Sequence, residues 1–115
     1  MINLYGIPNC DNVRRARKWL ESAKLAYHFH DFRKDGLDWK DLQRWVKAVG
    51  WEVLLNRRGT SWRQLSEAQR ADLTEARALQ LMLENPTLIK RPVIEHGKKI
   101  LVGVDLERYE AELRT

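Results

Sequence analysis

The first thirty-odd residues follow a strand–helix–strand pattern, and this pattern constrains the fold more than any other feature of the chain. Residues 1–5 have the composition of a strand, and residues 27–32 form a second strand that is rich in aromatic side chains. Between them, apolar residues recur at helical spacing, which predicts one buried helix face: Val13, Ala16, Leu20 and Ala23. Two strands joined by a helix are parallel with a right-handed crossover, so the chain begins as a βαβ unit.

Cys10, the only cysteine, lies where the first strand gives way to the helix. Unsatisfied N–H groups and the positive end of the helix dipole favour a thiolate at such a position, so we predict a reactive thiol. Asp11 is expected to cap the helix, and its carboxylate is expected to oppose thiolate formation. A single cysteine forms no intrachain disulfide, so the thiol's reaction partner must come from outside the chain.

Residues 38–85 read as a block of helices with little strand character. One apolar stripe predicts a helix after Asp38 that Gly50 is expected to end: Leu42, Trp45, Val46 and Val49. Ser66 and Gln69 predict a capping box, and Thr74 is expected to cap a last helix. The tryptophans in this block are expected to pack in its core: Trp39, Trp45, Trp51 and Trp62.

The C-terminal part returns to strands. Residues 92–95 and 100–102 are short apolar runs on either side of a turn, which predicts a hairpin, and a helix follows from Asp105 with Leu106, Tyr109 and Leu113 on one face. We expect one domain over residues 1–115, with a core of residues 1–36 and 87–115 and a helical insertion of about residues 37–86.

Composition narrows the possible partners. The chain has 115 residues and a formal net charge of +5, which suits anionic ligands as well as an ordinary solvated surface. We expect no nucleic acid, no membrane and no metal partner, because the sequence has no membrane-spanning run and no zinc-type ligand spacing; His28 and His30 lie on one strand face but lack further ligands. One cysteine and no signal peptide fit a cytoplasmic monomer.

Three sequence blocks, residues 4–12, 50–63 and 89–92, occur in the order typical of one family. On these blocks the chain resembles the arsenate reductase (ArsC)-like family in its YffB/Spx branch, over nearly its whole length. The resemblance implies an α/β, thioredoxin-like fold: a mixed four-stranded sheet with a helical insertion between strands 2 and 3. It also implies a Cys10 thiolate, an anion-binding Arg91 and a cis peptide bond before Pro92 that aims backbone groups at a peptide-like ligand.

The chain departs from the pattern of this family at four positions. Classical arsenate reductases carry a histidine where this chain has Gly6, and arginines that bind the oxyanion where it has Asn56 and Gly103. Fewer guanidinium groups hold arsenate less well, although Arg58 lies close to position 56. The redox-switch members carry a second cysteine where this chain has Val13, so an internal disulfide switch is excluded.

The leading functional prediction is a glutathione-dependent thiol/disulfide reductase, an oxidoreductase whose Cys10 is the nucleophile and whose glutathione is a co-substrate. Asn12, Arg58, Arg91 and Pro92 are the predicted substrate-binding residues, with Asn12 holding Cys10 through its side chain. Two alternatives stay open. One is a glutathione-linked arsenate reductase, and the other is an Spx-like regulator that binds RNA polymerase through the basic first helix.

Overall fold

The chain divides into two units. A computed structural model describes residues 1–114. One unit combines Met1–Gly36 with Arg91–Thr115, and the other is Leu37–Lys90. The expected organisation as a single domain stays a prediction, and Thr115, the last residue of its core, lies outside the described residues.

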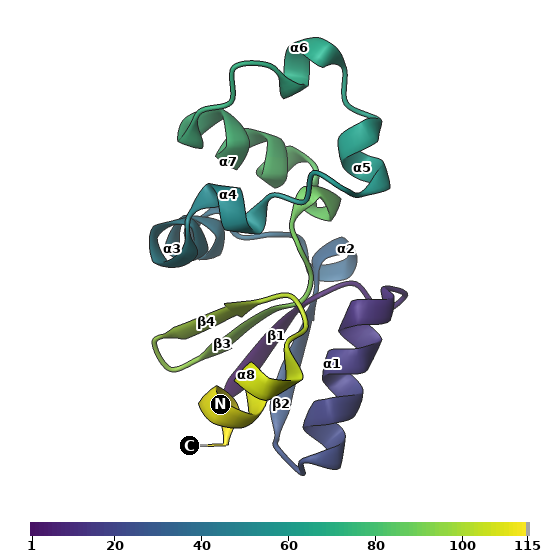
Figure 1. Ribbon diagram of the computed structural model, residues 1–115, viewed down its shortest axis with the longest axis vertical. Coiled ribbons are helices and arrows are strands. Elements are labelled where there is room, and N and C mark those ends of the chain that lie inside the picture. The colour runs from purple at the N-terminus through teal and green to yellow at the C-terminus, as the bar shows by residue number, and fades with distance from the viewer. Residues whose placement is uncertain (115) are drawn as a thin grey trace. The chain divides into compact units, whose positions relative to one another are not determined.

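The first unit contains a four-stranded mixed sheet with strand order β2-β1-β3-β4 (Figure 1). Its strands are β1 (Ile2–Gly6), β2 (Tyr27–Asp31), β3 (Val93–His96) and β4 (Lys99–Val102). β1 runs parallel to β2 and antiparallel to β3, and β3 and β4 form an antiparallel hairpin. The predicted thioredoxin-like sheet is confirmed, with both predicted strand pairs in place.

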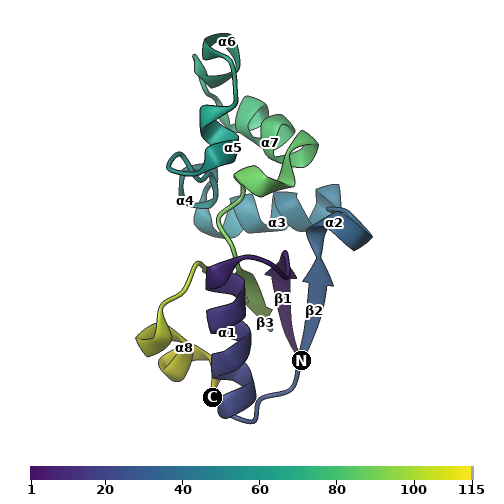
Figure 2. The same ribbon diagram turned by 90° about the vertical axis from the view of Figure 1, so that its right-hand side faces the viewer.

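Two helices, α1 (Asp11–Ser22) and α8 (Leu106–Leu113), lie on the same side of this sheet (Figure 2). Alternate residues of the strands face them, because successive side chains of a strand point to opposite faces. The core between sheet and helices consists of Ile2, Leu4, Val13, Ala16, Leu20, Ile94, Leu101, Tyr109 and Leu113. These residues include Val13, Ala16 and Leu20 of the apolar stripe predicted for the first helix, whereas Ala23, predicted as its fourth member, is the C-cap residue and is only half-buried.

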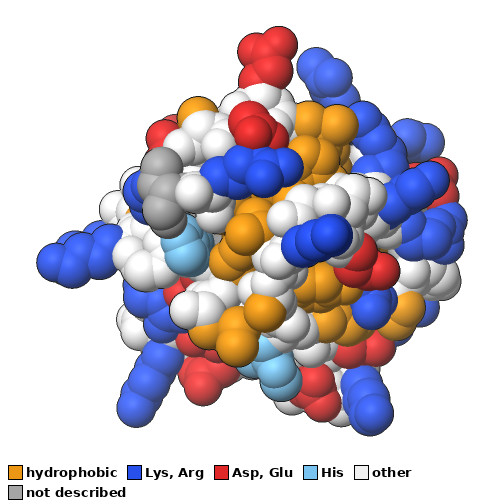
Figure 3. All heavy atoms as spheres, turned by 90° about the horizontal axis from the view of Figure 1, so that it is seen from below, with side chains coloured by type: hydrophobic (Ala, Val, Ile, Leu, Met, Phe, Trp, Pro, Cys, Tyr) orange, Lys and Arg blue, Asp and Glu red, His pale blue; other side chains and the backbone are white. Residues whose placement is uncertain are grey.

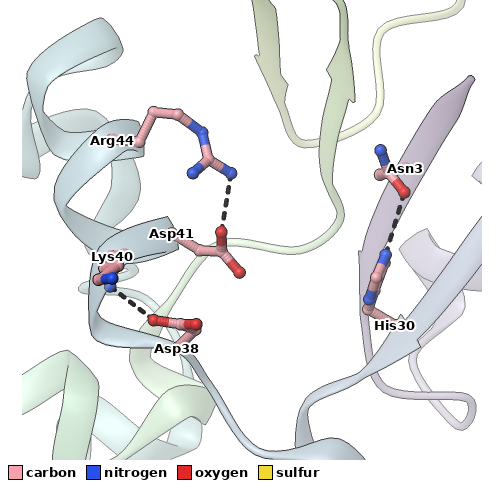
Figure 4. Close-up of polar contacts among 6 residues, drawn as sticks. All are labelled: Asn3, His30, Asp38, Lys40, Asp41 and Arg44. Atoms are coloured by element: carbon pink, nitrogen blue, oxygen red, sulfur yellow. Dashed lines mark hydrogen bonds and ion pairs between the residues drawn. The ribbon is translucent and has the colours of Figure 1, made fainter.

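The opposite face of the sheet carries a row of rings. The rings of Tyr5 and His30 stack with centroids 4.3 Å apart, and the ring of His28 meets His30 edge to face at 4.4 Å. A hydrogen bond of 3.1 Å joins His30 Nε2 and Asn3 Oδ1 across β1 and β2 (Figure 4). His28 and His30 therefore share one face as predicted. Residues 1–114 contain no group of three or more metal-ligating side chains.

The second unit is helical. Its elements are α3 (Trp39–Val49), α4 (Trp51–Leu54), α5 (Thr60–Arg63), α6 (Glu67–Arg70), α7 (Glu75–Glu84) and the 3₁₀ helix η1 (Pro86–Leu88). Asp38 caps α3 by accepting a hydrogen bond from the Lys40 N–H, and the Asp41 carboxylate pairs with Arg44 one turn on (Figure 4). Gly50 ends α3, as predicted, at a φ of +89°.

The predicted caps in this unit are correct, but one packing prediction is wrong. Ser66 and Gln69 form the capping box, and the Thr74 side chain caps α7. Trp45 is fully buried, whereas Trp39 is 42% exposed, because Trp39 begins α3 one turn before its buried stripe. Leu106 is exposed to the same extent for the same reason, since it is the first residue of α8.

The surface of the chain mixes charges of both signs. Figure 3 shows a face on which an apolar strip is bordered by Lys and Arg side chains with acidic side chains between them. On this face the excess of positive charge is therefore not gathered into one continuous patch. No helix among residues 1–114 is long and apolar enough to cross a membrane.

Candidate functional site

Cys10 lies at the N-terminus of α1, in the turn that follows β1. Its backbone is extended, with φ −99° and ψ 128°, and its N–H donates to the Ile7 carbonyl oxygen at 3.4 Å. Its own carbonyl oxygen accepts the first intrahelical hydrogen bond, from Arg14 N–H at 2.9 Å. Cys10 is therefore the N-cap residue, and its side chain is half-buried at the positive end of the helix.

The surroundings of Cys10 favour its ionised form. Partial burial is the largest single influence and raises the pKa of the Cys10 thiol. The Val13 N–H, the Arg91 side chain and the Asn12 N–H are hydrogen-bond donors toward the sulfur, and together with the Arg91 charge they outweigh burial. The net result is a thiol pKa below its ordinary value.

The predicted capping role of Asp11 is wrong. Asp11 is the first residue within the helix and not its cap, because Cys10 occupies the N-cap position. The Asp11 carboxylate pairs with the Arg14 guanidinium one turn on. This ion pair offsets part of the negative charge at the helix start.

Asn12 contributes through its backbone. Its N–H is one of the donors that lower the Cys10 pKa, and its side chain is exposed. The side-chain contact predicted between Asn12 and Cys10 is not among the influences on the thiol within residues 1–114. Any residue other than proline supplies this N–H, so the contact does not require asparagine at position 12.

The sheet topology explains why Arg91 reaches Cys10. β1 ends at Gly6 just before the cysteine turn, and it pairs antiparallel with β3, with Tyr5 opposite Val93. The start of β3 is therefore next to the end of β1, and Arg91 lies two residues before Val93. The Arg91–Pro92 bond is cis, as the family resemblance implies. The carbonyl oxygen of Pro92 accepts from Gly103 N–H at 2.9 Å.

One departure from the family pattern has a structural origin that sequence reasoning missed. A Cβ atom at Gly6 would lie 2.6 Å from Cγ2 of Val13, which is fully buried. A side chain at position 6 would therefore force Val13 to shift. This close contact accounts for glycine in place of histidine at position 6. The spacing of strand and helix does not reveal it, because it depends on side-chain positions.

Gly103 is unsuited to hold an oxyanion-binding side chain. Its φ is +83°, a conformation that L-residues rarely adopt. Its N–H bonds to Pro92, and its carbonyl oxygen accepts a short hydrogen bond of 2.5 Å from the Tyr109 hydroxyl. The position serves a turn between β4 and α8, which accounts for the absence of an arginine there.

Arg58 belongs to the second unit, so its predicted contact with the Cys10 ligand stays a prediction. It lines a pocket of about 430 Å³ within Leu37–Lys90. Asn56, at the other departure from the arsenate reductase pattern, accepts a hydrogen bond from Arg58 N–H at 3.0 Å. Asn56 thus shapes the loop that carries Arg58.

A single cysteine at the start of the first helix, on a four-stranded mixed sheet, defines a thioredoxin-like protein with a helical insertion. The chain belongs to the ArsC family, which matches residues 5–112. A solved YffB protein structure aligns with a TM-score of 0.96 at 50% identity, over 98% of this chain and 99% of that one.

Two further relatives cover almost the whole chain. An arsenate reductase (ArsC) related protein from Brucella melitensis aligns with a TM-score of 0.77 at 46% identity, over 99% of this chain and 95% of that one. The global transcriptional regulator Spx 1 of Lactococcus lactis subsp. lactis is 30% identical over 115 residues, 98% of this chain and 89% of the regulator. The chain therefore fits the YffB/Spx branch of the family.

Proposed function

We propose that this protein is a glutathione-dependent thiol/disulfide reductase that works in the cytoplasm as a monomer. The observation that carries the proposal is the Cys10 thiol, which has a lowered pKa at a helix N-terminus beside the Arg91 guanidinium. A thiolate is the nucleophilic form of cysteine. The family and its arsenate-reductase-related members support redox chemistry at this sulfur.

The reaction proceeds in two exchanges. The Cys10 thiolate attacks the glutathione sulfur of a mixed disulfide, a Cys10–glutathione disulfide forms, and the substrate leaves as a thiolate. A glutathione thiolate then attacks the glutathione sulfur of this intermediate, releasing oxidised glutathione and restoring the Cys10 thiolate. Each cycle consumes one free glutathione thiol: the mixed disulfide and this glutathione become the substrate thiol and oxidised glutathione, so the substrate sulfur is reduced and the incoming glutathione sulfur is oxidised. Arg91 stabilises the thiolate both as nucleophile and as leaving group.

Mass spectrometry and turnover test this proposal together. Treatment with oxidised glutathione should add one glutathione to Cys10, and reduced glutathione should remove it. Arg91→Ala should slow turnover of a glutathione mixed disulfide, whereas Arg33→Ala, which removes an exposed arginine from α2 (Phe32–Asp35), should not. A wild-type protein that forms no adduct and shows no turnover would rule the proposal out.

The relation to Spx favours a second candidate, a regulator that binds RNA polymerase through α1. The outer face of α1 carries the exposed basic residues Arg14, Arg15 and Lys18. Retention of purified polymerase on the immobilised protein at low salt, lost when Arg15 and Lys18 are both changed to Glu, would support it. The arsenate alternative predicts arsenate turnover that Arg91→Ala abolishes, and the loss of arginine at positions 56 and 103 argues against it.

A further inference from the structure

The pocket that contains Arg58 has a rigid base. It is lined by Glu52, Leu55, Asn56, Arg57, Arg58 and Lys90. Two segments form its base, and they are joined by two backbone hydrogen bonds. Asn56 N–H donates to the Leu88 carbonyl oxygen, and Lys90 N–H donates to the Leu54 carbonyl oxygen, both at 2.8 Å. Residues from two distant parts of the sequence are thus fixed side by side within the second unit.

The loop over this base is also held in place. Asn56 Oδ1 accepts from Arg58 N–H, and the Arg63 guanidinium donates to the Arg58 carbonyl oxygen at 2.7 Å. A Cβ atom at Gly59 would lie 2.9 Å from Asn56 Nδ2, so the loop closes tightly around the asparagine side chain. The backbone of Arg58 is therefore fixed at both its N–H and its C=O, while its side chain is exposed.

The pocket carries both positive and negative side chains, and among the described residues they are not paired with one another. Arg57, Arg58 and Lys90 supply three positive charges and Glu52 supplies one negative charge, all on exposed side chains. The Arg57 guanidinium lies over the Trp51 and Trp62 rings, 5.6 and 5.8 Å from their centroids. Within the described residues 1–114, none of these four side chains forms an ion pair.

We propose that this pocket binds the free amino-acid end of a γ-glutamyl peptide, with the basic side chains on its carboxylate and Glu52 on its ammonium group. The Glu52 carboxylate would repel a simple oxyanion, because both are negatively charged. A ligand that carries an ammonium group next to its own carboxylate would instead form an ion pair with Glu52. This proposal rests on the proposed function for its choice of peptide, and it concerns the second unit alone.

The test uses a ligand that cannot exchange disulfides. Calorimetry with S-methylglutathione and with its analogue that lacks the α-amino group should show about 1.5-fold to fivefold tighter binding of the amine-bearing ligand, the range expected of one exposed ion pair. Glu52→Gln should abolish this preference without weakening binding of the analogue. Arg58→Ala should weaken binding of both ligands, and Glu67→Gln, outside the pocket in α6, should change neither.

Several results would overturn the inference. One is an unchanged preference in Glu52→Gln. Another is binding of sulfate by the wild type as tight as that of S-methylglutathione, which would indicate a plain anion site. A third is a set of amide chemical-shift changes on binding that omits Arg58 and Lys90. All of these leave the exchange chemistry of Cys10 intact, whereas failure of Cys10 to form a glutathione adduct overturns the proposed function and leaves the pocket result standing.

Discussion

The lowered pKa of Cys10 comes from donors on two separate segments, the first turn of α1 and Arg91. We therefore expect the rate of alkylation by iodoacetamide to rise with a pH midpoint below that of an ordinary thiol, whose pKa is about 8.5. Arg91→Ala should move the midpoint to higher pH, because it removes both a hydrogen bond and a positive charge. Arg33→Ala should leave it unchanged. A wild-type profile that matches free cysteine would contradict the assignment.

The Gly6–Val13 contact makes a second prediction at the scale of single residues. Gly6→Ala should lower the free energy of unfolding by about 1–3 kcal/mol, because the new methyl group overlaps a buried Val13 methyl group. Val13→Ala should also destabilise, by leaving a cavity. The double variant should be more stable than the sum of the two single effects predicts, as measured by urea unfolding. If the two single effects simply add, the Gly6–Val13 contact is not the cause of the destabilisation in Gly6→Ala.

How far the sequence predicts the site depends on the kind of contact. Cys10 at a helix start follows from local pattern, and the cis bond at Pro92 follows from family resemblance. The Gly6–Val13 contact and the pairing of Asp11 with Arg14 depend on side-chain positions that spacing alone does not specify. These are the features that sequence reasoning missed or assigned wrongly.

At the scale of elements, the caps of α6 and α7 were predictable, because each depends on one or two side chains and the N–H groups next to them, whereas the cap predicted for α1 was wrong. Asp105 caps α8 by accepting from Arg108 N–H at 3.1 Å. Asp105→Ala should cost about 0.5–2 kcal/mol of unfolding free energy, and Asp105→Asn should retain most of it, since asparagine also caps well. Equal losses in both variants in urea unfolding would assign the effect to charge and not to capping.

The elements that sequence reasoning missed are short and depend on their surroundings. Residues 32–35 form α2, although Phe32 reads as the end of the preceding strand. Asp31 ends the strand there because its carboxylate accepts from the N–H groups of Arg33 and Lys34. The hydrogen bonds of this one side chain decide whether Phe32 extends the strand or begins a helical turn. The composition of the segment does not reveal them.

At the scale of the whole molecule, buried Tyr109 makes the free energy of unfolding depend on pH in the alkaline range. Burial and then the nearby Asp105 charge raise the pKa of Tyr109 well above its ordinary value of about 10. Above that value the unfolded chain loses this proton while the folded chain keeps it, so the free energy of unfolding should fall as pH rises. Tyr109→Phe should remove this part of the slope. A urea-unfolding series from pH 9 to 11 measures it, and identical slopes would contradict it.

The order of elements along the chain predicts the sheet and its helical insertion, because parallel and antiparallel connections differ in length. The chain leaves the first unit after Gly36 and returns to it at Arg91. Residues 88–90 belong to the second unit, where they pair with residues 54–56.

That return point has a consequence for shortening the chain. Arg91, which lowers the pKa of Cys10, directly follows the helical unit with no linker between them. Removal of one residue just before Arg91 would therefore pull its guanidinium away from the sulfur, whereas a shorter loop between two helices of the second unit would leave this approach unchanged.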